Sequence, residues 1–185
     1  MELEVRVWTI QRVEWLEALQ RRGYITGDGR RVWRIFRAPY AWMMGQMARR
    51  MPAYNGRFPI WVWHSPKPDL RRGAHLAKGV EGVRVELSLP RERVLLLDFE
   101  TWHAVLNGWH LSLSDAESEA WDRRVARLKS LPPDLRGELE ATWERVFDFA
   151  ALRESGLWGP IDRIQGVTDR VEANQVRRVD RFVSR

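Results

Sequence analysis

One short stretch constrains the fold of this chain more than any other. Between residues 83 and 89, the apolar residues Val83, Val85, Leu87 and Leu89 alternate with polar ones. Successive side chains of a β-strand point to opposite faces, so this pattern predicts a half-buried strand with one face on an apolar core. Because a single strand is not stable alone, the chain must build a sheet that packs against other elements.

Other strands are predicted from short apolar runs. The clearest run is Pro59 to His64, and Val94 to Leu97 is a second one. Val5 to Ile10 predicts a first strand, whereas Val32 to Phe36 is either a short strand or an irregular extension. Two extended segments between Ile164 and Val183 are interpreted as a returning hairpin or an edge pair.

Helices are indicated by capping residues placed before apolar positions at helical spacing. Thr9 is expected to cap a first helix that ends at Gly23. Further helix starts are predicted near four positions: Pro39, Asp98, Ser114 and Pro132. At 185 residues the chain suits one domain. The prediction is an α+β fold: a single compact domain over residues 1–185, with a small mixed or antiparallel sheet and about four to five helices.

The composition excludes several function classes. The chain has no cysteine, and it has no apolar run near the ~20 residues that a membrane helix needs. Because the first residues also lack the pattern of a signal peptide, we expect a soluble cytoplasmic protein without a membrane partner. The chain lacks Gly-rich phosphate loops and the Gly-x-Ser-x-Gly motif. It carries no signal for an oligomeric state.

Positive charge gathers in the first part of the chain. Residues 1–80 hold 15 Lys and Arg against 6 Asp and Glu, whereas residues 81–185 hold 16 against 19. This asymmetry favours a polyanionic partner, chiefly nucleic acid, although an arginine-rich composition would also produce it. Most of the eleven tryptophans are expected in the core. Trp33, between Arg31 and Arg34, is the best candidate for stacking on a base, although a core position is the simpler interpretation even there.

The polar loop from Ser65 to Gly79 is the leading candidate for a binding segment. Its prolines exclude regular structure, and long loops in compact domains are often functional. A nucleic-acid backbone would contact basic side chains in and near this loop, namely Lys67, Arg71, Arg72, Lys78, Arg31 and Arg34.

The four histidines all lie between residues 58 and 110, which raises the alternative of catalysis. His64, His75 and His103 are candidate acid–base groups, although a neutral, hydrogen-bonded role is the simpler interpretation of His103. Asp98 and Glu100 fit a helix cap and a first-turn carboxylate better than a catalytic pair. The histidine spacing is too irregular for a zinc signature, so no metal site is predicted.

Several segments together resemble a known family. They include Ala38-Pro-Tyr-Ala-Trp-Met, His75-Leu-Ala-Lys-Gly, Leu96-Leu-Asp-Phe-Glu-Thr-Trp-His and Ile164-Gln-Gly. The combination resembles a bacterial family catalogued as a domain of unknown function (number 3841), over nearly the whole chain. The resemblance implies no activity. After Gln165 the family tends to continue through an aromatic residue and a glutamate, and Thr168-Asp169-Arg170 departs from that pattern.

The order of the predicted elements is also similar to the layout of ADP-ribosyltransferases. That resemblance implies a dinucleotide, NAD, as cofactor, held by an Arg or His of the first strand. Arg6 or Thr9 and the late Gln165 would be the matching cofactor-binding positions. The catalytic glutamate of such enzymes falls on Val167 here, so Glu172 would need to replace it.

Three functions therefore stand. The favoured one is a nucleic-acid-associated binding protein that uses the Ser65 to Gly79 loop. The second is an enzyme acting on nucleotides or nucleic acid, with His64, His75, His103 and Glu172 as its polar groups and NAD as its cofactor. The third is a structural or protein-interaction domain.

Overall fold

A computed structural model describes residues 3–73 and 75–185 of the chain. The fold is mixed α+β, with a six-stranded sheet, a two-stranded sheet and several helices, as the sequence predicts. The chain forms two compact units. Unit 1 comprises Met1–Leu96 and Gln165–Arg185, and unit 2 comprises Leu97–Ile164. The assignment of residues 1–185 to a single domain stays a prediction.

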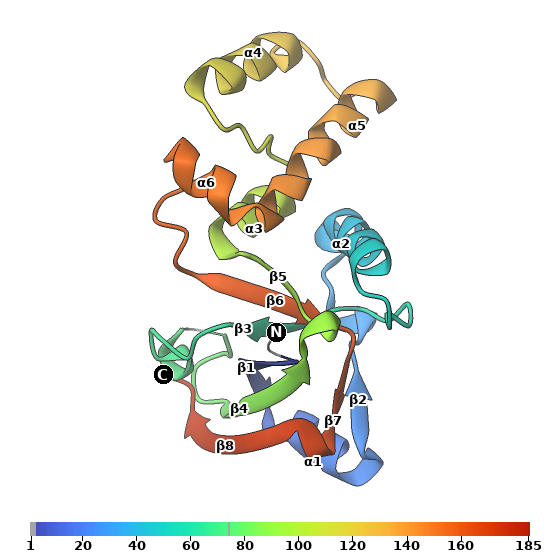
Figure 1. The fold of residues 1–185 in the computed structure, drawn as a ribbon, viewed down its shortest axis with the longest axis vertical. Coiled ribbons are helices and arrows are strands. Elements are labelled where there is room, and N and C mark those ends of the chain that lie inside the picture. Colours follow the sequence, from blue (N-terminus) through green and yellow to red (C-terminus); the bar gives the residue numbers. More distant parts are fainter. Residues whose placement is uncertain (1–2, 74) are drawn as a thin grey trace. The chain divides into compact units, whose positions relative to one another are not determined.

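The large sheet is built around its first strand, and its order is β5-β6-β3-β1-β4-β8 (Figure 1). β1 pairs antiparallel with β4 along its whole length, from Glu4 opposite Pro90 to Arg12 opposite Gly82. The strands are β1 (Glu4–Arg12), β3 (Ile60–Trp63), β4 (Glu81–Pro90), β5 (Leu95–Asp98), β6 (Ile164–Thr168) and β8 (Val176–Val183). The small sheet pairs β2 (Tyr24–Thr26) with β7 (Arg170–Glu172).

The alternating stretch lies in β4, and its apolar residues form the core. Val83, Val85 and Leu87 are fully buried, and the first helix, α1 (Val13–Arg22), packs three apolar side chains into the same cluster. These are Trp15, Leu16 and Leu19. Gly23 ends α1 in the left-handed conformation, with φ of 77°, as predicted.

One local prediction is wrong, and two others hold in only one of their alternatives. Thr9 does not cap α1: it lies inside β1, and α1 begins only at Val13. Residues 32–36 form no strand, and the chain there is irregular and makes a 3₁₀ turn before α2 (Arg37–Arg50). The tail forms no hairpin, because β7 pairs with β2, whereas β8 pairs with β4 at the edge of the large sheet.

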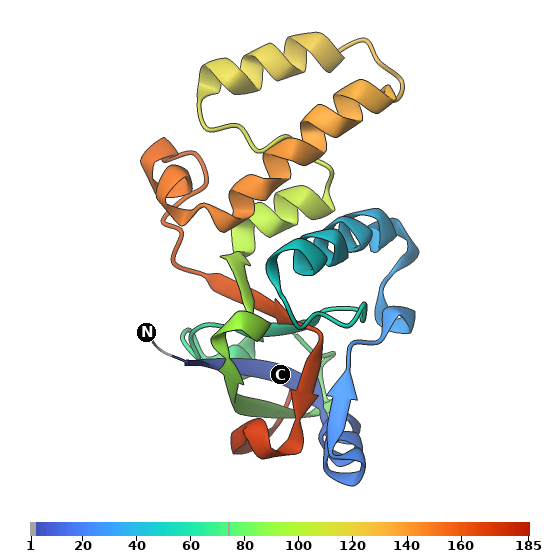
Figure 2. The ribbon, with the colours of Figure 1, turned by 45° about the vertical axis from the view of Figure 1, so that its right-hand side comes forward.

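Unit 2 is mostly helical. Its helices are α3 (Phe99–Leu106), α4 (Asp115–Val125), α5 (Pro133–Thr142) and α6 (Phe149–Ser155). Asp98 caps α3 and Ser114 caps α4, as predicted. α4 and α5 lie side by side and are joined by the Arg124–Glu138 ion pair, at 2.7 Å (Figure 2). The described residues thus contain six α-helices, slightly more than expected, and none of these is long and apolar enough to cross a membrane.

Candidate functional site: an arginine-rich cleft in unit 1

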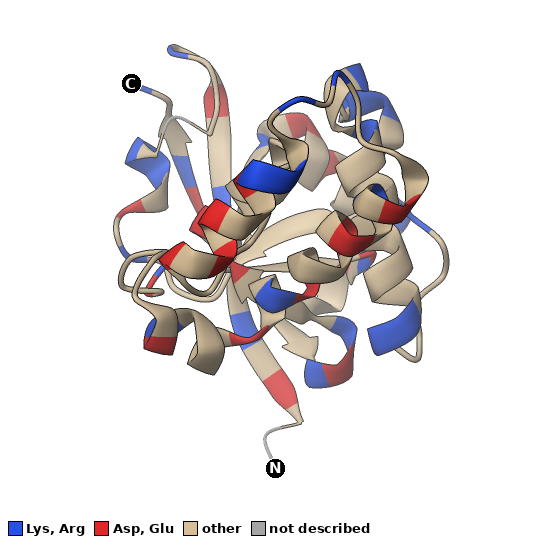
Figure 3. Cartoon of the chain, turned by 90° about the horizontal axis from the view of Figure 1, so that it is seen from above, with Lys and Arg blue, Asp and Glu red and all other residues tan. Residues whose placement is uncertain are grey.

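The charge of the chain divides between its two units. Unit 1 carries 23 Lys and Arg against 12 Asp and Glu, a net charge of +11, whereas unit 2 carries 8 against 13, a net charge of −5. Basic and acidic segments nevertheless adjoin on the same helices and strands (Figure 3). A site therefore cannot be located from net charge alone and has to be found from the shape of the surface and from the pairing of its charges.

Unit 1 contains a cleft of about 1170 Å³. Its walls come from the sheet strands β1, β3 and β6, from α1 and α2, and from the segments at residues 24–32 and 56–59. Five arginines line it: Arg22, Arg30, Arg31, Arg37 and Arg57. Its aromatic residues are Trp15, Tyr24, Tyr40, Phe58, Trp61, Trp63 and His75. The cleft thus combines positive charge with many aromatic rings.

Most of the cleft arginines form no ion pair with a carboxylate of the described residues. The carboxylates of the lining are Glu14 and Asp28. Asp28 accepts hydrogen bonds from the Nε and Nη2 atoms of Arg30, both at 3.0 Å, and these bonds hold its pKa below the usual range. Among the residues that the structure describes, no ion pair involves the other four guanidinium groups, which are those of Arg22, Arg31, Arg37 and Arg57.

The segment that carries Arg30 and Arg31 packs tightly on Phe58. Gly27 forms a β-bridge with Phe58, and a Cβ atom at Gly27 would lie 1.8 Å from the Phe58 carbonyl oxygen. A Cβ atom at Gly29 would lie 2.4 Å from the Phe58 ring. Only glycine permits approaches this close, so both glycines hold the two arginines at the cleft.

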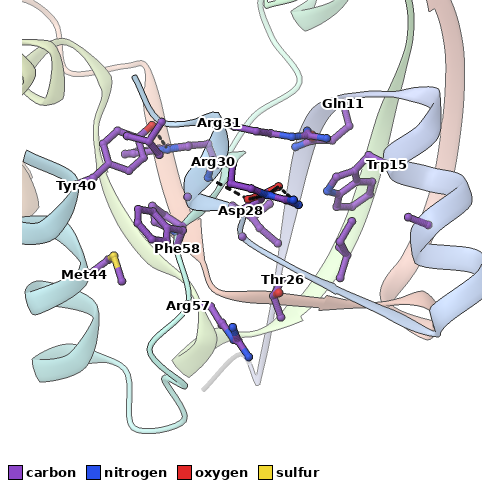
Figure 4. A pocket seen from close by; sticks show the side chains of 18 of the residues that line it. Gln11, Trp15, Thr26, Asp28, Arg30, Arg31, Tyr40, Met44, Arg57 and Phe58 are labelled. Carbon is purple, nitrogen blue, oxygen red and sulfur yellow. Dashed lines mark hydrogen bonds and ion pairs between the residues drawn. The ribbon is translucent and has the colours of Figure 1, made fainter. Parts of the chain in front are cut away.

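Aromatic and polar groups face one another across the cleft. Tyr40 and Phe58 lie on one side, Gln11 and Trp15 lie on the opposite side, and the Asp28 to Arg31 segment lies between them (Figure 4). On the β3 wall, Trp61 Nε1 donates a hydrogen bond to the Tyr40 hydroxyl at 2.9 Å. Burial raises the pKa of Tyr40, so its hydroxyl remains protonated at neutral pH.

Two glutamines place amide groups at the sheet side of the cleft. Gln165 of β6 lies opposite Trp63 of β3, and its side chain is mostly buried. Gln11 of β1 donates to the Thr9 hydroxyl at 3.0 Å, and Thr9 in turn donates to the Trp61 carbonyl at 2.9 Å. These bonds link β1 to β3 and fix the orientation of the Gln11 amide.

Of the predicted nucleic-acid contacts, only Arg31 lines this cleft. Arg34 is exposed in a 3₁₀ turn, and the loop lysines Lys67 and Lys78 are exposed outside the lining. Arg71 donates to both oxygens of Asp69, and Arg72 and Arg84 approach the same carboxylate within 4.0 and 3.6 Å. The hydrogen bonds from Arg71 lower the pKa of Asp69 to about 2, so the Asp69 carboxylate stays charged and neutralises the Arg71 guanidinium inside the loop.

The candidate catalytic residues do not gather in one place. His75 lines the cleft, with its ring 5.6 Å from that of Trp63. His64 is exposed beyond the end of β3, and His103 belongs to unit 2, where its Nδ1 lies 2.8 Å from the Phe99 carbonyl oxygen. Glu172 lies outside the lining and pairs with Arg170 at 3.1 Å.

The candidate cofactor-binding residues also separate. Gln165 lines the cleft, whereas Thr9 is buried and its hydroxyl is taken up by the bonds between β1 and β3. Arg6 is exposed and lies 3.5 Å from Glu86, outside the lining. Within residues 3–73 and 75–185, no group of three or more possible ligands could hold a metal ion.

Most of the residues that line the cleft could not be predicted from the sequence. Arg22, Arg37 and Arg57 are separated along the chain and come together only through the fold. The Gly27-Asp-Gly-Arg-Arg31 turn is the part of the cleft that the sequence could indicate. Glycine is typical of segments where the backbone approaches another group closely, and here two glycines lie beside two arginines. Residues at 56–59 carried no such signal.

Fold and site together define a mixed α+β protein with a basic, aromatic-lined cleft. A family model described as "Domain of unknown function (DUF3841)" matches residues 6–177, so the chain belongs to this family. The match includes every residue that lines the cleft. No curated protein and no solved structure matches the chain.

Proposed function

We propose that this protein binds single-stranded nucleic acid in the unit 1 cleft, in the cytoplasm of its cell. One observation carries the proposal: four guanidinium groups that form no ion pair among the described residues line the same cleft as Tyr40, Phe58 and Trp61. Guanidinium groups bind phosphates, and aromatic rings stack on bases in a sequence-tolerant way. A chain without cysteine suits a reducing compartment such as the cytoplasm.

The shape of the site favours a single strand over a duplex. Proteins that recognise duplex DNA insert a helix or a β-ribbon into a groove, which requires a projecting element. Here the four arginines that form no ion pair within the described part of the chain line a concave surface instead. Its volume of about 1170 Å³ exceeds the ~300–1,000 Å³ of a typical small-molecule site, so it has room for more than one nucleotide.

In this proposal the phosphate contacts lie in the cleft rather than in the Ser65 to Gly79 loop. Asp69 already neutralises Arg71 in that loop and lies beside Arg72. The loop contributes His75 to the cleft lining, and Lys67 and Lys78 add exposed charge outside it. The loop lysines would therefore strengthen association in general without selecting the bound strand.

Equilibrium binding of short fluorescent oligonucleotides tests the proposal. The double variant Arg31→Ala with Arg57→Ala removes two cleft charges, and we expect it to weaken single-strand binding about tenfold or more. The control, Arg181→Ala with Arg185→Ala, removes the same charge from unit 1 outside the cleft and should have a small effect. If both variants lose affinity equally, or if the wild type prefers duplex, the proposal is wrong.

An enzyme acting on a dinucleotide is the second candidate, and one observation favours it. Gln165, the late glutamine that the transferase layout implies, lines the cleft together with β1 and β3. Val167 is fully buried and Glu172 lies outside the lining, so neither supplies a carboxylate there. Glu14, which no ion pair among the described residues engages, would have to act instead. Incubation with labelled NAD tests this, because release of nicotinamide that Glu14→Gln abolishes would establish an enzyme.

A further inference from the structure

A second cavity, of about 360 Å³, lies within unit 2. We propose that it binds a methylated ammonium group. Three tryptophans, Trp109, Trp121 and Trp158, provide its walls, and Asp115 and Asp122 add negative charge. Trp109 is 59 % exposed, so one wall of the cavity is open to solvent. The proposal of a methylated ammonium ligand is independent of the nucleic-acid strand that we propose for the unit 1 cleft.

Hydrogen bonds inside unit 2 hold these walls in place. Trp158 Nε1 donates to the Ser112 carbonyl at 2.8 Å, and Trp143 Nε1 donates to the Trp109 carbonyl at the same distance. His110 Nδ1 lies 2.8 Å from Ser112 Oγ, and its ring stacks on Trp121 with centroids 4.6 Å apart. The polar atoms of Ser112 are therefore taken up, and the lining combines the rings of Trp109, His110, Trp121 and Trp158 with three polar side chains of α4.

The charge around this cavity is negative and largely unbalanced. Asp115 and Asp122 lie seven residues apart on one face of α4, both are exposed, and neither forms an ion pair within the described part of the chain. Arg124 lies 5.8 Å from the Trp121 ring centroid, but Glu138 holds it at 2.7 Å. Burial lowers the pKa of His110, so its imidazole is neutral at pH 7.

A methylated ammonium group fits this combination better than other cations. A primary ammonium is strongly hydrated and is bound best by hydrogen-bond acceptors that surround it, whereas the acceptors of this lining, Asp115, Ser118 and Asp122, all lie on α4. Methyl groups remove most of that hydration, and the ion then binds to indole faces through cation–π attraction. The two exposed carboxylates attract the same ion by charge. Among the described residues, no three side chains gather as ligands for a metal ion.

Titration with choline and with 3,3-dimethylbutan-1-ol tests the charge requirement, because the second molecule has the shape of choline without its charge. Calorimetry and the NMR shift of the Trp109 indole N–H would report binding. We expect saturable binding of choline and at least tenfold weaker binding of the neutral alcohol. Equal binding of the two, or no saturable binding of choline and of the peptide described next, would overturn the proposal.

A short peptide with one trimethyllysine, compared with its unmodified lysine form, identifies the source of the group. Tighter binding of the methylated peptide than of choline assigns a methylated protein as ligand, whereas equal binding assigns a free ammonium compound. Equal affinity for both peptides would contradict a methylammonium site. Trp109→Ala and Asp122→Asn should each weaken binding about three- to tenfold. The controls Trp33→Ala, in unit 1, and Asp134→Asn, outside the lining, should leave it unchanged.

Discussion

At the scale of single residues, Asp98 shows how a helix cap can carry an electrostatic cost. Its side chain is fully buried, and its Oδ1 accepts hydrogen bonds from the Thr101 amide at 2.9 Å and the Thr101 hydroxyl at 3.0 Å. Its Oδ2 has no partner among the described residues. Burial raises the pKa of this carboxyl, which means that the folded state binds the Asp98 proton more tightly than the unfolded state does.

This shift predicts a particular dependence of stability on pH. The stabilising contribution of protonated Asp98 is complete below the unfolded pKa of 3.8 and is lost as pH rises through the higher folded pKa. Asp98→Asn keeps a capping side chain without the charge, so its stability relative to wild type should rise over that window. Urea unfolding at a series of pH values measures the difference. A constant difference between the two proteins would contradict the assignment.

Replacing Asp98 by alanine separates the cap from the charge. Asp98→Ala removes the acceptor for the Thr101 amide and should cost about 1 kcal/mol relative to Asp98→Asn at pH 7. Chemical unfolding of the two variants compares them directly. If Asp98→Ala were as stable as Asp98→Asn, the hydrogen bond to Thr101 would contribute nothing to stability.

The glycines beside Phe58 give a second prediction at this scale. In Gly27→Ala or Gly29→Ala the added Cβ atom would overlap Phe58, so the segment from Gly27 to Arg31 would have to move. We expect either variant to weaken oligonucleotide binding by displacing Arg30 and Arg31. Gly45→Ala is the matched control, because a Cβ atom at this position in α2 meets nothing within 4 Å. It should add about 0.5–1 kcal/mol of stability and leave binding unchanged.

At the scale of elements, a buried ion pair joins segments that are far apart in the sequence. Asp169, between β6 and β7, is fully buried and accepts from Arg93 at 3.0 Å and from the Asn55 amide at 2.9 Å. That position thus has a structural role in this chain, which ties the residues next to the cleft to the turn before β5.

Loss of this carboxylate should destabilise the protein strongly. Asp169→Ala would leave Arg93, whose side chain is only 20 % exposed, without its partner and should cost about 3 kcal/mol. Glu119→Ala breaks the Arg123–Glu119 pair, whose side chains are about 70 % exposed, and should cost no more than about 0.5 kcal/mol. Denaturant unfolding compares the two. Similar losses would show that Asp169 is not needed as a buried partner.

The elements also show which features were predictable from sequence. The alternation at Val83 to Leu89 and the caps at Asp98 and Ser114 are local patterns, and the structure confirms all three. Thr9 does not cap a helix, because it pairs with Val85 of β4 and β1 continues beyond it to Arg12. The predicted hairpin in the tail does not form, because β7 and β8 each pair with a strand that is distant in the sequence.

The candidate site was less predictable than the fold, for the same reason. The composition of the Ser65 to Gly79 loop predicted a binding segment, yet in the structure Asp69 forms an ion pair with Arg71 inside this loop. The cleft draws its groups from six separate segments of the chain, and no window of sequence contains more than a few of them. Arginine alone does not mark a site, because pairing decides which charges are available to a ligand.

At the scale of the whole molecule, two units of opposite charge carry two different cavities. The basic unit holds the arginine cleft, and the acidic unit holds the tryptophan cavity. The net charges of +11 and −5 favour a polyanion for the first and a cation for the second. The chain-wide value of +6 conceals this division.

The salt dependence of single-strand binding tests the central claim most directly. Each phosphate contact on a single strand contributes about 0.7 to the slope of log affinity against log salt concentration. Arg31→Ala with Arg57→Ala should therefore reduce the magnitude of that slope by about 1.4. The control Arg181→Ala with Arg185→Ala should leave it unchanged. An unchanged slope in the cleft variant, or an equal reduction in both, would contradict phosphate binding by the cleft arginines.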